Sequence, residues 1–149
     1  MLDSGGGSYQ ELVYDDQIKW VVDTSSELTA KYGDIPAIAF FHIPSTGYQK
    51  VYSPNLCQGT ANDTVSPQTQ ANKLISTLFA QANVRMTVVG HNHGNNWCCP
   101  VLGSDHIICY ARHTGYGGYG TWMRGSRVLI LKEQGQYSTY VRMEDGRII

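Results

Sequence analysis

Charged residues are scarce in this sequence. Lys, Arg, Asp and Glu make up 15% of the 149 residues, whereas soluble domains average about a quarter. The net charge is −1, so the chain lacks the basic excess that binds nucleic acid or an anionic membrane. Long apolar runs are also absent, because none approaches the roughly 20 residues of a membrane span. We therefore expect neither nucleic-acid binding nor a membrane-spanning segment.

The first residues, "MLDSGGGSY", lack the basic start and apolar run of a signal peptide. They are typical of a strand end followed by a loop, so we expect the chain to begin inside a larger protein. The length suits a single domain over residues 1–149, which is large enough to bury a core.

The four cysteines lack the CxxC spacing of a zinc knuckle. Cys98 and Cys99 are adjacent and unsuited to pairing with each other. The sequence predicts two disulfides, with Cys57 joined to one of this pair and Cys109 to the other. Buried free thiols are the alternative.

Asn62 begins the tripeptide Asn-Asp-Thr, an acceptor sequence for N-glycosylation in a polar loop. In place of charged residues, the sequence is rich in Gly, Tyr, Ser, Thr, Asn and Gln. This composition is more frequent in proteins outside the cytosol. Together with the expected disulfides, these features predict a glycoprotein of the extracellular space or the secretory or vacuolar lumen.

Two segments have helical patterns. Apolar residues recur at near-helical spacing from Ile18 to Leu28, and Gly33 is suited to end that helix. A second helix is predicted from Ser66, as a cap before a proline, with Leu74, Ile75, Leu78 and Phe79 on one face. The polar segment 45–66 between them is expected to be a surface loop.

Residues 35–44 and 84–90 are short apolar runs typical of strands buried on both faces. Three further strand-like segments at 106–111, 126–133 and 137–143 predict a C-terminal antiparallel meander. The expected fold class is a layered α/β sandwich with a mixed sheet and two helices.

Three histidines follow the two buried strands. His91 and His93 in "GHNHG" lie two residues apart, a spacing that directs both side chains to one side of an extended backbone. His42 ends the other strand in "AFFHIP", and sites in open α/β sheets form at the carboxyl ends of strands. The three imidazoles can therefore converge on a metal. Ordinary hydrogen bonding by structural histidines is the alternative.

The succession "FFHIP", "GHNHGNNWC" and "CYARHTGYGGYGTWMRGSRVL" resembles the C-terminal half of the calcineurin-like metallophosphoesterases. The resemblance is strongest to their eukaryotic purple-acid-phosphatase-like (Dcr-type) branch, and it extends over nearly the whole chain. It implies an αββα sandwich with two metals, chosen from Fe, Zn and Mn. His42 and His91 would bind one metal and His93 the other, and the pair would activate a water molecule.

The acidic motifs that complete such a site are missing from this sequence. The family's Asp-x-His, Gly-Asp-x-x-Asp and Gly-Asn-His motifs have no counterpart here, and Asn92 and Asn96 stand where the branch usually has aspartates. Loss of carboxylates that orient ligands weakens a metal site. We therefore assign no catalytic residue, and the chain alone is expected to lack the metal pair.

Arg112, His113 and Arg124 are weak candidates for phosphate contacts, with solvated side chains as the alternative. The tyrosines of the adjacent "GYGGYG" loop are expected to pack near the site.

Two functions remain open at this level. The chain is either a fragment or subunit of a metallophosphatase, inactive alone, or a catalytically dead protein that serves structure or assembly. Both require a partner, because half of a sandwich exposes apolar faces and strand edges. That partner is expected to be the missing N-terminal half or further copies of the chain, as a homo-oligomer or filament.

Overall fold

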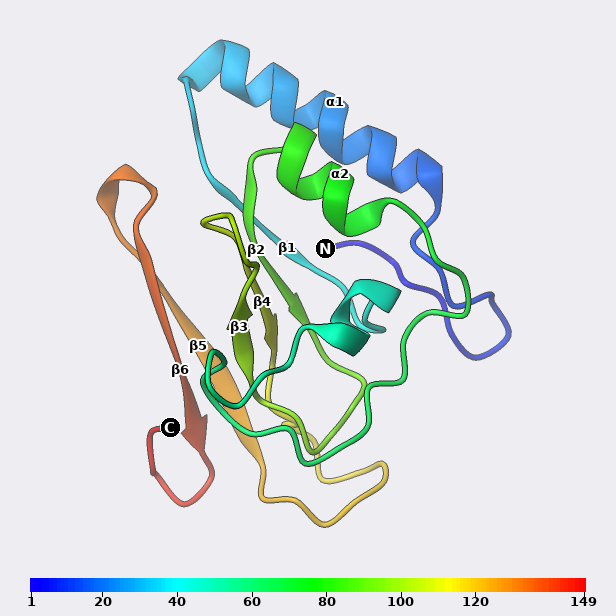
Figure 1. The fold of residues 1–149 in the computed structure, drawn as a ribbon, viewed down its shortest axis with the longest axis vertical. Helices are drawn as coiled ribbons and strands as arrows, with labels where there is room; N and C mark the ends of the chain where they lie inside the picture. Colours follow the sequence, from blue (N-terminus) through cyan, green and yellow to red (C-terminus); the bar gives the residue numbers. More distant parts are fainter.

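The computed structural model describes residues 1–149, the side chain of Gln134 excepted. Its elements form three layers (Figure 1), with two helices on one face of a four-stranded sheet and a two-stranded hairpin on the other. The chain is therefore a small α/β fold with a mixed sheet. No helix in the described residues is long and apolar enough to cross a membrane.

Helix α1 (Asp15–Tyr32) matches the predicted segment and ends at Gly33, whose φ of 84° is in the left-handed region that favours glycine. Asp15 and Asp16 lie in its first turn and Lys31 in its last, which complements the helix dipole.

Helix α2 (Leu74–Gln81) is shorter than predicted, and the start at Ser66 is wrong. The buried side chain of Gln68 accepts a hydrogen bond from the Val13 backbone at 3.0 Å and donates to the Ile43 carbonyl at 2.9 Å. These long-range bonds hold the segment before Leu74 outside a helix. The predicted apolar face is present, since Leu74 and Leu78 are fully buried.

The four-stranded sheet has the order β1-β2-β4-β3. Strands β1 (Ala37–Phe40), β2 (Val84–Val89) and β4 (Ile107–Tyr110) are parallel, and β3 (Cys98–Pro100), which was not predicted, is antiparallel to β4. Strand β2 is almost entirely buried, as its apolar run predicts. Strand β1 was also predicted to be buried on both faces. This is wrong, because its place at an edge of the sheet leaves it partly exposed.

The predicted three-stranded meander is wrong. Strands β5 (Gly125–Leu131) and β6 (Tyr137–Met143) form an antiparallel hairpin, connected through a 3₁₀ turn at Glu133–Gly135. Strand β4 is not part of it, because β2 and β3 occupy both of its edges. Residues 111–124 then carry the chain to another layer.

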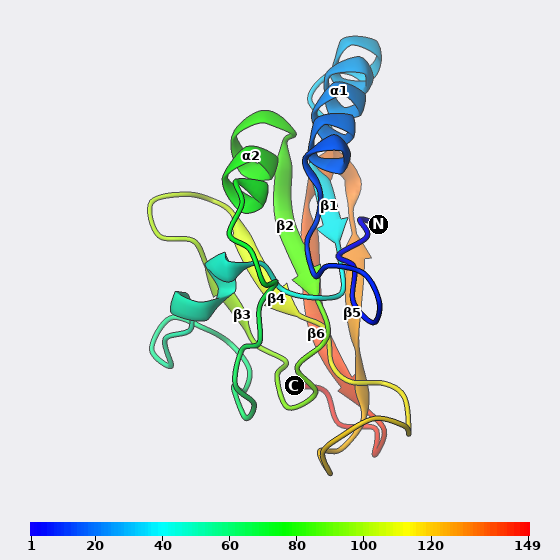
Figure 2. The same cartoon turned by 90° about the vertical axis from the view of Figure 1, so that its right-hand side faces the viewer.

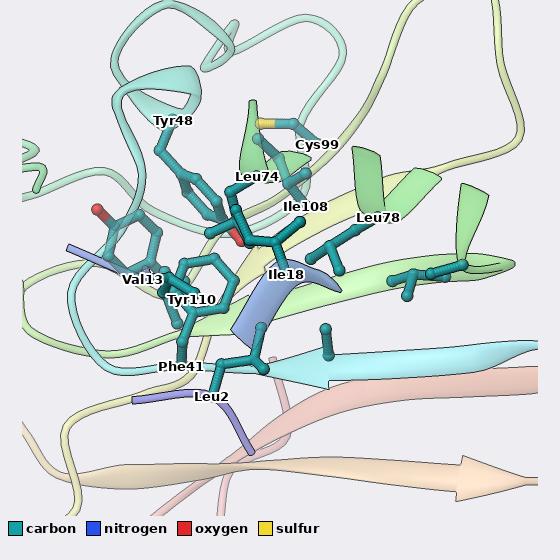
Figure 3. Packing of buried hydrophobic residues seen from close by; sticks show 14 of the residues in the cluster. Leu2, Val13, Ile18, Phe41, Tyr48, Leu74, Leu78, Cys99, Ile108 and Tyr110 are labelled. Atoms are coloured by element: carbon teal, nitrogen blue, oxygen red, sulfur yellow. The ribbon is translucent and has the colours of Figure 1, made fainter. Parts of the chain in front are cut away.

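The main core lies between the helices and the sheet, where Ile18, Leu74, Leu78 and Ile108 pack together (Figure 3). A 3₁₀ helix at Thr46–Lys50 adds the buried Tyr48 to this core. A smaller cluster joins the opposite face of the sheet to the hairpin through Met86, Val88, Cys109, Leu129 and Tyr137. The hairpin therefore supplies part of the cover that the sheet requires on its second face.

Two disulfides connect the loops to the sheet. Cys57 pairs with Cys99 and Cys98 with Cys109, in agreement with the predicted pattern. The second bond links residues directly opposite each other in the β3–β4 pair. The first anchors the long loop before α2 to β3.

Candidate functional site

A pocket of about 250 Å³ lies at the carboxyl ends of the parallel strands. These ends point toward the loops at the bottom of Figure 2, away from the α1–β1 connection. His42 follows β1, His91 and His93 follow β2, and His113 follows β4, and all four line the pocket. The structure thus brings together the three predicted ligands and adds a fourth imidazole.

His42 and His91 form one half of the pocket. Their rings meet edge to face, with centroids 5.3 Å apart. Gly90 allows this approach, because a Cβ there would lie 3.1 Å from His42 Nδ1. His91 has a φ of 71°, a strained conformation for a non-glycine residue that is typical of functional sites. Burial lowers the pKa of His42, and the nearby His91 and His93 lower it further.

His93 lies between two aromatic rings. It stacks on His113 at 4.0 Å and on Tyr119 at 4.2 Å between centroids. Its Nδ1 donates to the Tyr119 carbonyl at 2.8 Å, which leaves Nε2 as the acceptor nitrogen of the neutral ring. A Cβ on Gly118 would lie 2.5 Å from the His93 ring, so the glycine-rich loop can cover it closely. The tyrosine-bearing loop therefore packs on the site, as its sequence predicts.

Tyr119 also connects this loop to a second one. Its hydroxyl donates to the carboxylate of Asp63 and accepts the His93 backbone N–H at 3.1 Å. Asp63 further accepts from the Gly94 N–H at 3.4 Å. Through these contacts Asp63 holds the tyrosine-bearing loop and the segment after His93 together.

The arginines near the pocket are engaged by backbone carbonyls. The guanidinium of Arg112, which is buried at the pocket wall, donates to the Met123 carbonyl at 2.7 and 2.9 Å and to the Gly94 carbonyl at 3.3 Å. Arg124 lies outside the pocket lining and donates to carbonyls of its own loop, including that of Trp122 at 2.9 Å. Both arginines thus stabilise the loop between β4 and β5.

His113 contributes an unpaired nitrogen to the site. Its Nε2 is buried and has no hydrogen-bond partner among the described residues. Desolvation lowers its pKa, as do His93, Arg124 and Arg112. A neutral imidazole is therefore favoured at this position.

The pocket contains no acidic ligand. None of the residues that line it is Asp or Glu, and within the described part of the chain no three His, Cys, Asp or Glu side chains are arranged to hold a metal ion. A metal pair requires a bridging carboxylate to offset the repulsion between the cations. The residues present therefore do not fit the two-metal centre that the family resemblance implies.

Three asparagines in the segment after β2, of which Asn92 lines the pocket, have a structural role that the sequence did not reveal. The side-chain oxygens of Asn92, Asn95 and Asn96 accept backbone N–H groups from the loop 60–66, at 3.3, 3.1 and 2.6 Å. All three residues are buried. They fasten the loop rather than orient a ligand. Three asparagines between residues 92 and 96, just before a cysteine pair, are the sequence signal that could have indicated these contacts.

Comparison with known proteins finds relatives of the chain among probable inactive purple acid phosphatases. The chain is 28% identical over 149 aligned residues to probable inactive purple acid phosphatase 29 of Arabidopsis thaliana, covering 87% of this chain and 38% of that protein. It is 30% identical to probable inactive purple acid phosphatase 28 of the same plant, over 80% of this chain and 30% of the relative.

Probable inactive purple acid phosphatase 14 of Arabidopsis thaliana is 24% identical over 92% of this chain and 38% of its own length. No protein-family model matches the chain, and no solved structure matches it at a significant level. The chain thus spans less than two-fifths of the length of these relatives, and the similarities support a relation to the purple acid phosphatases.

Proposed function

We propose that this chain is a phosphatase-derived module that does not hydrolyse phosphate esters by itself. The observation that carries the proposal is the pocket of four imidazoles without a carboxylate. The names of all three relatives, which include the words "probable inactive", are consistent with it.

His42, His91 and His93 are the residues that we propose as remnants of a metal site. Neutral imidazoles can bind a borderline transition-metal ion. The chain offers no bridging ligand to place a second cation beside the first, and His93 is restrained by Tyr119 and His113. One weakly held ion is the most that this arrangement supports, and the two-metal clamp on a phosphate is missing.

A phosphatase assay tests this proposal. Purified 1–149, supplied in turn with Mn, Zn or Fe, should show no turnover of an activated aryl phosphate. The variant His91→Ala removes a pocket imidazole, and His106→Ala is its matched control, since His106 stacks on Phe79 outside the pocket. Turnover that His91→Ala abolishes and His106→Ala preserves would overturn the proposal.

The second part of the proposal concerns a partner. Four exposed apolar side chains form a strip across α1, the segment before β1 and the hairpin: Trp20, Leu28, Ile35 and Leu131 are 58%, 47%, 48% and 70% exposed. Ile35 lines two adjacent grooves, one toward Trp20 and Leu28 and one toward Leu131, which makes the strip continuous. Apolar surface of this kind is typical of interaction sites.

The occupant that we propose for this apolar strip is a polypeptide equivalent to the unmatched portion of the longer relatives. The relatives contain more than twice the matched length, and the strip adjoins β1, which is one of the two edge strands of the sheet. Without that partner, copies of the chain would bury the strip in a homo-oligomer or filament. This assembly role is the alternative to membership in a complete phosphatase.

Sedimentation of isolated 1–149 at micromolar concentration tests the strip. We expect species heavier than the 16.5 kDa monomer. The double variant Trp20→Ser/Leu131→Ser should restore the monomer. Tyr9→Ser, which changes an even more exposed side chain that lines neither groove, should not. A stable monomer of the unmodified chain would contradict this part of the proposal.

A further inference from the structure

The loop beside the histidine pocket is held at its backbone by buried asparagines. Asn96, Asn95 and Asn92 bind the N–H groups of Thr60, Asp63 and Ser66 in turn, and the disulfide from Cys57 anchors the loop further upstream. An isolated β-bridge between Ala61 and Asn95 adds to these contacts. The loop therefore has a defined position, and its exposed side chains project from fixed points.

Asn62 differs from those three asparagines. It is exposed, and its side chain makes no hydrogen bond with the described residues, although its neighbours Ala61 and Asp63 are both tied to Asn95. Of the seven asparagines in the chain, Asn62 alone has Ser or Thr two residues further on. That residue, Thr64, is also exposed. The acceptor Asn62 and the Thr64 of its tripeptide are thus both exposed to solvent in the folded chain, while Asp63 between them is half-buried.

We propose that Asn62 carries an N-linked glycan, which makes the loop beside the histidine pocket a solvent-facing surface of the protein. The donor is an oligosaccharide linked to a lipid diphosphate. The Asn62 amide nitrogen forms a bond to C1 of the first sugar and loses a proton to a base. The bond between C1 and the diphosphate oxygen breaks, and the lipid diphosphate leaves with that electron pair.

The two disulfides support this chemistry, because they form in the oxidising compartments where N-glycosylation takes place. The adjacent Asp63 binds the Tyr119 hydroxyl, and Tyr119 stacks on the pocket residue His93, so two residues connect the glycan site to the pocket. The apolar strip and the loop 60–66 share no residue. Figure 1 shows this loop at the far end of the molecule from the α1–β1 connection.

The placement of the glycan has a consequence for association, which rests on the partner proposed above. A glycan on the pocket face leaves the apolar strip uncovered, so glycosylation and assembly should be compatible. A partner seated on the pocket face would instead collide with the glycan.

Expression of 1–149 behind a cleavable secretion signal in eukaryotic cells tests the modification. The intact mass should exceed that of the polypeptide, and peptide N-glycosidase should remove the excess and leave aspartate at residue 62. Thr64→Ala, which keeps Asn62 but destroys the acceptor tripeptide, should abolish the excess, whereas Thr64→Ser should retain it. The intact mass is measured for both the secreted protein and the protein retained in the cell. A variant that folds poorly and is not secreted is then still informative. A bare polypeptide mass in both pools of the unmodified chain would overturn the proposal.

A second measurement tests the position of the glycan. Sedimentation of glycosylated protein and of the enzymatically deglycosylated protein should give the same assembly state. If deglycosylation alone converts monomers to oligomers, the pocket face is an interface and its assignment as a solvent-facing surface is overturned. The mass measurement does not depend on association. A failure of the proposal that the apolar strip mediates association can therefore be distinguished from a failure of the proposal that Asn62 is glycosylated.

Discussion

The two disulfides close loops of different length, which predicts the order in which their removal destabilises the protein. We compare the double variants Cys57→Ala/Cys99→Ala and Cys98→Ala/Cys109→Ala. Each pair consists of one buried and one half-buried cysteine, so the packing lost on substitution by alanine is similar. The difference between the variants therefore reports the cross-link together with the hydrogen bond of 3.1 Å that the Ser53 N–H donates to Cys57 Sγ.

The sequence separations are 42 residues for Cys57–Cys99 and 11 residues for Cys98–Cys109. In the chain-entropy model, closing these loops removes about 4 and about 3 kcal/mol of unfolded-state entropy at 25 °C. The loops overlap only at residues 98–99, and each variant keeps the other disulfide. We expect the long-loop variant to lose about 1 kcal/mol more stability than the short-loop variant.

Urea unfolding followed by circular dichroism measures this difference, with the unmodified oxidised chain as reference. Similar m-values in both variants would show that stability, and not residual structure, accounts for the change. An equal loss in the two variants, or a greater loss for Cys98→Ala/Cys109→Ala, would refute the loop-entropy argument. It would also indicate that the bond across β3–β4 acts mainly through strand pairing.

Three further predictions concern single side chains. Arg127→Gln should lower the free energy of unfolding by about 2–3 kcal/mol, measured in urea, because the Arg127 guanidinium joins the hairpin to the Tyr110 and Asn96 carbonyls. Tyr119→Ala should raise the reactivity of His93 toward diethyl pyrocarbonate, whereas Tyr119→Phe, which keeps the stacked ring, should raise it less. Equal reaction rates in the two variants would contradict the inference that the Tyr119 ring shields His93. Because the pKa of His42 is lowered on folding, the unfolded chain binds its proton first as pH falls, so stability should decline below about pH 6.5. In thermal melts, His42→Gln should reduce the dependence of the melting temperature on pH. An unchanged pH dependence would contradict this prediction.

Several parts of the fold were accessible from local patterns. The helical periodicity and the terminal glycine predicted α1, and the apolar runs predicted the strands β1 and β2, which the structure pairs in parallel. From the parallel arrangement of these two strands it follows that His42, His91 and His93 lie at one edge. The adjacent cysteines left two disulfide patterns open, and the structure contains one of them.

Other features depend on contacts between distant segments. The start of α2 was wrong because Gln68 bonds with Val13 and Ile43, neither of which lies near it in sequence. The meander was wrong because a strand pattern indicates extended backbone but not its neighbours, and β4 pairs with β2 and β3.

The sequence by itself determined the chemistry of the site: three imidazoles after two apolar strands, with no acidic motif beside them. Only the tertiary structure decided how these groups are used. It placed His113 and Tyr119 on the two faces of His93, and it assigned Asn92 and Asn96 to the backbone of a distant loop. The physical reason is that residue types and spacing specify which groups a strand end presents. Partners contributed by loops many residues away depend on how the whole chain packs.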